Sequence, residues 1–137
     1  MTRTHVTTLE GQDISVNSVL DCTITVGAEA ANVINVAIQL TGQDGADLGA
    51  VGNVVAYLSD AATGVGITAG VPDGGVAIGT DGAVLVSHVT NAMWTLNSEV
   101  DGDIDLDITD TTGTPTWYLC VILPTGETKV SDAITFA

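Results

Sequence analysis

The chain is built from short segments in which apolar and polar residues alternate, separated by turns rich in glycine and aspartate. Residues 103–109 and 32–40 alternate most cleanly. Their apolar members are Ile104, Leu106 and Ile108 in the first segment and Ile34, Val36, Ile38 and Leu40 in the second. A period of two predicts strands with one buried face, whereas no stretch keeps the helical period over a useful length. With about eight or nine such segments spaced about 8–12 residues apart, the sequence predicts an all-β sandwich.

Two local patterns carry more specific expectations. Residues 76–86 hold two short apolar segments on either side of Asp81-Gly82. Because Asp-Gly favours tight hairpin turns, we expect the two segments to pair with each other. Residues 128–136 are expected to form one last strand after the turn at Pro124. Residues 60–75 are rich in glycine and predict a long surface loop, of the kind that often carries contacts.

The longest run of strand-favouring residues is 116–124, which reads Thr-Trp-Tyr-Leu-Cys-Val-Ile-Leu-Pro. Such a run predicts a strand that is apolar on both faces. Trp117, Leu119 and Val121 point to one side of it. Sheet-on-sheet packing would cover one face, and the other would need a cover or a partner molecule. We expect these three residues to form a covered or partner-binding surface.

The charge balance excludes several classes of partner. The chain has 2 Lys+Arg against 17 Asp+Glu, for a formal net charge of −15. Almost nothing could neutralise phosphates, so neither nucleic acid nor an anionic membrane is an expected partner. An acidic surface instead keeps crowded copies soluble and apart. No window approaches the roughly 20 apolar residues that span a bilayer.

The acidic stretch Asp101–Asp107 could suggest a Ca²⁺ site, but its sixth position is Leu106 and not the glycine of an EF-hand loop. A solvated strand face is the preferred interpretation. His88 follows Ser87, and neither belongs to a pattern of nucleophile, base and orienting acid. We therefore expect no metal, no cofactor and no enzymatic activity.

The cysteines, Cys22 and Cys120, are expected to be free buried thiols. No apolar segment typical of an export signal follows Met1–His5, and neither cysteine has the neighbours of a zinc or redox motif. Trp94 is expected in the core, with glycan binding by an exposed tryptophan as the alternative.

The sequence divides into an N-terminal arm with a first strand, residues 1–31, and a sandwich, residues 32–137. Residues 1–12 are polar and rich in threonine, which predicts an arm that needs something to dock on. Within it, Thr4, His5 and Val6 are expected interface residues.

Tyr118-Leu119-Cys120 resembles the Tyr-x-Cys of strand F in immunoglobulin-like domains. That resemblance implies an immunoglobulin-like β-sandwich, in which the tyrosine hydroxyl bonds back to the corner before the strand. The family's partner cysteine on strand B is missing, which puts an intersheet disulfide in doubt.

More of the chain, from about Val33 to Ala137, resembles the Ig-like domains of tailed-bacteriophage virion proteins. The matching segments are 33–36, 57–60, 72–82, 99–104 and 116–119. The resemblance implies a structural or adhesive module of the virion, assembled in the host cytoplasm.

Together these features predict a capsid decoration or cement protein. It would stabilise the head through contacts with the major capsid protein and with its own copies, as a homo-oligomer on the particle. The alternative is a tail or fibre module that binds host surface glycans through residues 60–75 and Trp94.

Overall fold

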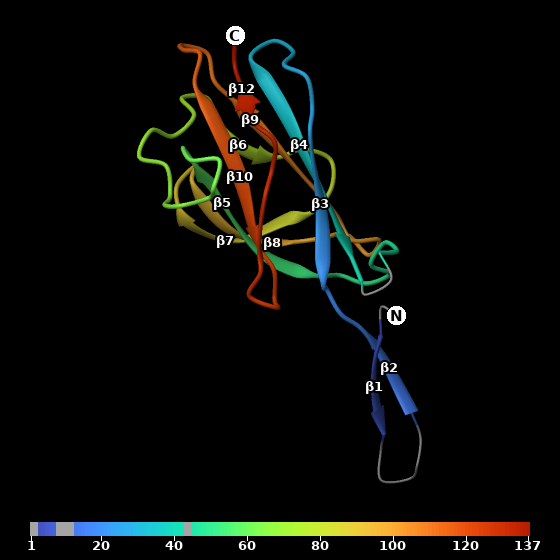
Figure 1. Cartoon of the computed structure of the whole chain (residues 1–137). Helices are drawn as coiled ribbons and strands as arrows, with labels where there is room; N and C mark the ends of the chain where they lie inside the picture. Colours follow the sequence, from blue (N-terminus) through green and yellow to red (C-terminus); the bar gives the residue numbers. More distant parts are fainter. Residues whose placement is uncertain (1–2, 8–12, 43–44) are drawn as a thin grey trace.

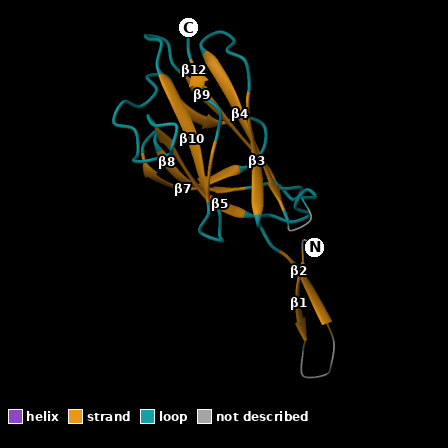
Figure 2. Cartoon of the chain, viewed as in Figure 1, coloured by secondary structure: helices purple, strands orange, loops and turns teal. Residues whose placement is uncertain are grey.

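The computed structural model describes residues 3–7, 13–42 and 45–137, with side chains from residue 18 onward within these ranges. In this part of the chain there are strands, turns and loops but no helix, and the strands form two packed antiparallel sheets and a separate hairpin (Figures 1 and 2). The predicted all-β sandwich is confirmed.

One sheet has four strands in the order β3-β4-β9-β6. Their bounds are β3 Asp21–Val26, β4 Val33–Thr41, β9 Asp103–Thr109 and β6 Gly75–Ile78. The clean alternation of β4 and β9 fixes their register, because Ile34 pairs with Ile108 and Ile38 with Ile104. A slip of one residue would turn every apolar side chain of a strand to solvent.

The other sheet follows the order β11-β10-β5-β8-β7, and β12 also pairs with β10. The bounds are β11 Thr128–Val130, β10 Thr116–Ile122, β5 Asn53–Ser59, β8 Met93–Asn97, β7 Ala83–Val89 and β12 Ile134–Thr135. β7 therefore lies at one edge, and it contains two register shifts against β8.

The core lies between the two sheets and is formed by their inward side chains. Its strand residues include Ile34, Val36, Ile38, Leu40, Ile104, Leu106 and Ile108 from one sheet and Val54, Leu58, Trp94, Leu96, Trp117, Leu119 and Val121 from the other. Burying each such side chain contributes about 1.5–3 kcal/mol to folding. The inward alternation predicted for both segments is confirmed by this burial.

The arrangement is immunoglobulin-like. β3-β4-β9-β6 takes the order A-B-E-D, while β5, β10 and β11 take the places of C, F and G in the facing sheet. β3 pairs with β4 along its whole length, from Asp21 opposite Thr41 to Val26 opposite Val36. A boundary between residues 31 and 32 would therefore separate two neighbouring strands of one sheet.

The N-terminal arm contains a β-hairpin. β1 Arg3–Thr7 pairs antiparallel with β2 Asp13–Asn17, and this pair is separate from both sheets of the sandwich. Figure 1 shows it extending beyond the end of β3. A two-stranded hairpin is marginally stable in water by itself, so a docking partner would stabilise it.

Two local expectations are wrong. The segments on either side of Asp81-Gly82 do not form a hairpin, because β6 pairs with β9 in one sheet and β7 with β8 in the other. The Asp-Gly link instead crosses between the sheets. The last strand is also divided into β11 and β12, which both pair with β10. Between them, the Ser131 N–H donates to the Leu119 carbonyl, and the Leu119 N–H donates to the Ser131 hydroxyl oxygen.

Candidate interaction surface

Charge is segregated between the two sheets. Strands β5, β7, β8, β10 and β12 contain no Asp, Glu, Lys or Arg, and β11 contributes Lys129 alone. In the other sheet, Asp21, Asp103, Asp105 and Asp107 alternate with apolar residues that face the core. Because inward positions are apolar, every strand carboxylate of the sandwich projects from one outer face.

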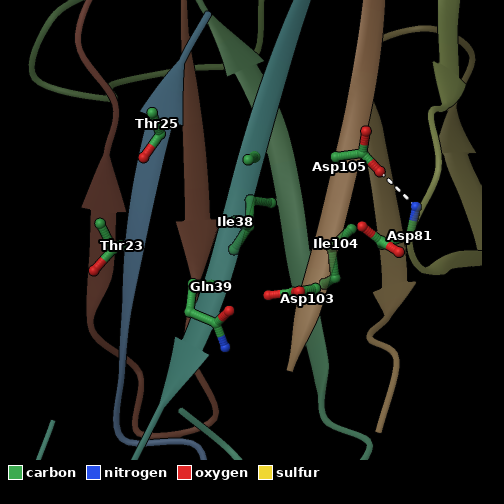
Figure 3. Close-up of a pocket in the computed structure, with 9 residues that line it drawn as sticks. Thr23, Thr25, Ile38, Gln39, Asp81, Asp103, Ile104 and Asp105 are labelled. Carbon is green, nitrogen blue, oxygen red and sulfur yellow. Dashed lines mark hydrogen bonds between the residues drawn. The ribbon is translucent and has the colours of Figure 1, made fainter. Parts of the chain in front are cut away.

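The acidic face, defined here as the outward side of β3, β4 and β9, is organised by hydrogen bonds. The Asn35 amide donates to Asp105 at 2.6 Å and to Asp107 at 2.8 Å. The second oxygen of Asp105 accepts the backbone N–H groups of Thr80 and Asp81 at 2.8 and 2.6 Å. Of these residues, Asp81 and Asp105 line a hollow of about 210 Å³ together with Thr23, Thr25 and Gln39, as Figure 3 shows.

Two aspartates on this face have opposite pKa shifts. Desolvation, followed by the negative charges of Asp101 and Asp81, raises the pKa of Asp103. Desolvation also acts on Asp105, but the donors from Asp81, Asn35 and Thr80 outweigh it and lower its pKa. Among the residues that the structure describes, no group of three or more His, Cys, Asp or Glu side chains is placed to hold a metal ion.

The uncharged face is the outward side of β5, β7, β8 and β10. Tyr57 opposes Cys120 there, Val55 opposes Ile122 on one side and Thr95 on the other, and Thr95 opposes Val86. Asn53, Val55, Thr95, Ile122 and Pro124 line a shallow, mainly apolar hollow of about 170 Å³. On so acidic a chain, this face can approach another acidic surface with the least electrostatic cost.

The loop after β5 covers one end of the uncharged face. The Tyr57 hydroxyl donates to the Gly64 carbonyl at 2.5 Å, and a Cβ on Gly64 would lie 3.1 Å from the Cys120 sulfur. Burial raises the pKa of both the Tyr57 hydroxyl and the Cys120 thiol. At the tip of this loop, Val65 is 76% exposed.

β7 is exposed along its whole length. Its larger apolar side chains, Val84, Leu85, Val86 and Val89, are 41–52% exposed. The His88 ring lies against the neighbouring strand, with Nε2 2.7 Å from the Thr95 hydroxyl. The edge of the uncharged sheet is thus apolar as well as uncharged.

The surface expected on β10 is a covered one, and its partner-binding alternative is wrong. Trp117, Leu119 and Val121 are buried at 3%, 0% and 0% exposure in the core between the sheets. The Trp117 indole donates to the Gly70 carbonyl at 2.9 Å, and its ring meets Phe136 edge-on at a centroid distance of 5.9 Å. The facing sheet covers this side of β10, so a partner cannot reach it in the folded chain.

The other expected interface residues lie in the N-terminal hairpin. Thr4 pairs with Val16, His5 with Ser15 and Val6 with Ile14. Their side chains fall outside those that the structure describes, so the expectation for them stays a prediction. Residues 8–12 of the arm lie outside the described residues altogether.

Both cysteines are free and buried, as predicted. Cys22 faces the core opposite Leu40, whereas Cys120 lies on the uncharged face under the loop at Gly64. The two sulfurs therefore belong to different sheets, with Cys22 between the two sheets and Cys120 on the outer side of its own sheet. In an immunoglobulin domain the second cysteine of the intersheet bridge faces the core, so the Tyr-x-Cys segment has the opposite orientation here. The tyrosine-to-backbone bond is made by Tyr57 and not by Tyr118.

Trp94 is buried at 3% exposure, which confirms its place in the core. A buried indole offers no stacking platform for a sugar. Trp94 therefore cannot contribute to the glycan site that was expected at this residue and residues 60–75.

The sequence contains a signal for the uncharged face that its local patterns do not show. Several strands lack charged residues in a chain where Asp and Glu are frequent. Only the strand order shows that these strands are neighbours.

No protein-family model matches the chain, and no curated protein matches it significantly. In the described part of the chain, no helix is both long and apolar enough to cross a membrane.

Proposed function

We propose that this protein is a non-enzymatic structural component of a tailed-bacteriophage virion, of the capsid decoration or cement type. The observation that carries the proposal is the segregation of charge: one outer sheet face bears aspartates and the other bears no formal charge. A freely dispersed acidic protein has no need for such an arrangement. A subunit that lies on a larger particle needs one face to bind and one to remain in water.

In this role the uncharged face contacts the major capsid protein, and the N-terminal hairpin provides a second attachment. Each contact is small, but icosahedral symmetry repeats it, and linked weak contacts hold far more strongly than single ones. The acidic face points outward and keeps particles apart.

A matched pair of substitutions tests the binding face. Thr95 lies at the centre of the uncharged face, and Thr25 is exposed on the acidic face. Thr95→Asp and Thr25→Asp each add one carboxylate. The variants are mixed with undecorated capsids of the virus that encodes the protein, at neutral pH.

We expect Thr95→Asp to weaken capsid binding at least about tenfold, because a carboxylate must be desolvated at the contact. Thr25→Asp should leave binding within about twofold of the unchanged protein. Equal effects of the two substitutions, or no binding of the unchanged protein, would refute the proposed function.

A further inference from the structure

The sandwich has four sheet edges, and β7 differs from the other three. β6 has 4 residues and β11 has 3, and short edge strands resist pairing with other chains. β11 also carries Lys129, and β3 carries Asp21, so charge protects both edges. β7 has 7 residues and no charge.

Natural proteins protect exposed edges with charges, proline, short strands or bulges. Of these devices, β7 has only the two register shifts, between Val84 and Val86 and between Ser87 and Val89. These bend the strand but leave its apolar side chains exposed. An edge of this length and composition is a template for another strand, since its outer backbone groups have no neighbour in the sheet.

We infer that β7 pairs antiparallel with β7 of a second copy, so that the uncharged sheet continues across a twofold axis. The argument for a second copy is electrostatic. Two copies, each with a net charge of −15, repel one another, and the least unfavourable approach is through uncharged surfaces. A basic partner would be drawn instead to the acidic face.

The distribution of nearby charge also selects the direction of pairing. Asp81 precedes β7, whereas His88 and Asn91 lie at its other end. In an antiparallel pair, Asp81 of each copy lies toward the histidine end of its partner. A parallel pair would place the two Asp81 carboxylates together. The interaction is therefore self-complementary only in the antiparallel form.

The inference goes beyond the proposed function, because the edge can pair whether or not the uncharged face binds a capsid. The exposed strip is narrow compared with the roughly 1,200 Å² buried by a stable interface, so the expected dimer is weak in solution and strengthened on a particle. Salt should tighten the dimer, because it screens the repulsion between the two acidic bodies.

Sedimentation velocity of the full chain over a range of protein and salt concentrations measures this association directly. Hydrogen exchange provides a second readout, since amides of residues 83–89 should become more protected as the dimer forms. Val86→Lys places two cations near the twofold axis, at a side chain exposed enough to tolerate lysine in the monomer. Val65→Lys is the matched control, on an exposed loop away from the edge.

We expect Val86→Lys to weaken dimerisation at least about tenfold and to remove the protection, with Val65→Lys unchanged. A chain that stays monomeric at every concentration and salt would overturn the inference, as would a dimer that Val86→Lys leaves intact. Loss of the dimer on deletion of residues 1–12 would also overturn it, because the arm of a second copy would then occupy the edge. A dimer that forms but binds no capsid supports the inference and refutes the proposed function alone.

Discussion

At the scale of single residues, the acidic face contains neighbours with opposite electrostatic roles. Asp103 and Asp105 lie two positions apart on β9 and point to the same side. Asp103 is surrounded by other carboxylates, whereas Asp105 accepts hydrogen bonds from two backbone N–H groups and from Asn35. Desolvation and then these carboxylates raise the pKa of Asp103, whereas the donors to Asp105 outweigh desolvation and lower its pKa, so the same substitution should have opposite effects on stability.

Asp103→Asn should raise the free energy of unfolding at neutral pH by about 0.5 kcal/mol, because it removes a repelled charge. The pKa of Asp103 is higher in the folded chain, so its favourable contribution exists below the unfolded value of about 3.9 and is lost as pH rises through the folded value. The gain from the substitution should therefore disappear in acid. Denaturant unfolding across this pH range measures it.

Asp105→Asn should lower the free energy of unfolding at neutral pH by on the order of 1 kcal/mol, because its charge-assisted hydrogen bonds weaken. The pKa of Asp105 is lower in the folded chain, so its contribution exists above about 3.9 and is lost as pH falls through the folded value. The loss should shrink in acid. Effects of the same sign for the two variants would contradict this account of the face.

At the scale of elements, β10 is the strand whose two faces have different roles: one packs in the core and the other forms part of the uncharged face. Leu119 is buried in the core, and Ile122 is half-buried at the shallow hollow of the uncharged face. Leu119→Ala should lower the free energy of unfolding by about 2–5 kcal/mol, since it leaves a cavity between the sheets. Ile122→Ala should cost less, about 1 kcal/mol, because solvent can fill the space.

Thermal and denaturant unfolding of the two variants gives the comparison. Capsid binding by the folded fraction should fall for Ile122→Ala and stay unchanged for Leu119→Ala. If Leu119→Ala weakened capsid binding and Ile122→Ala did not, the inner side of β10 would be the interface, which would contradict the burial of Leu119.

At the scale of the whole molecule, the sandwich and the N-terminal hairpin are expected to have separate roles. The described core begins at Val19, after the hairpin. Deleting residues 1–12 should therefore change the free energy of unfolding by less than about 0.5 kcal/mol, as for surface changes away from the core. The shortened chain should no longer bind capsids. Circular dichroism and co-sedimentation measure the two effects, and unchanged binding would refute the role of the arm.

Much of the fold could be predicted from local pattern. Apolar alternation placed Ile34 to Leu40 and Ile104 to Ile108 facing inward, because side chains two positions apart share a face of a strand. The run at 116–124 was correctly predicted as a strand that is apolar on both faces; the facing sheet covers its inner side, and the loop at Gly64 lies over Cys120 on its outer side. Which parts of the chain pack on each side of this strand could not be predicted from residues 116–124 alone.

The errors concern which strands pair and which face of a strand is covered. Asp81-Gly82 has the composition of a hairpin turn, yet β6 and β7 join different sheets, where β6 pairs with β9 and β7 pairs with β8, the strand that follows it. Tyr118 and Cys120 match a known motif, but they lie on the outer side of their sheet. A short motif does not specify which face of its strand the rest of the chain will cover.

By itself, the sequence determined that this protein is a set of strands, which residues of most strands are buried, and that its surface is strongly acidic. These depend on residues close together in the chain. Only the tertiary structure decided that the uncharged strands are neighbours in one sheet, that the strand carboxylates share the opposite face, and that β7 is an edge. Strand order depends on packing between segments that are far apart in the chain, so a local pattern does not specify it.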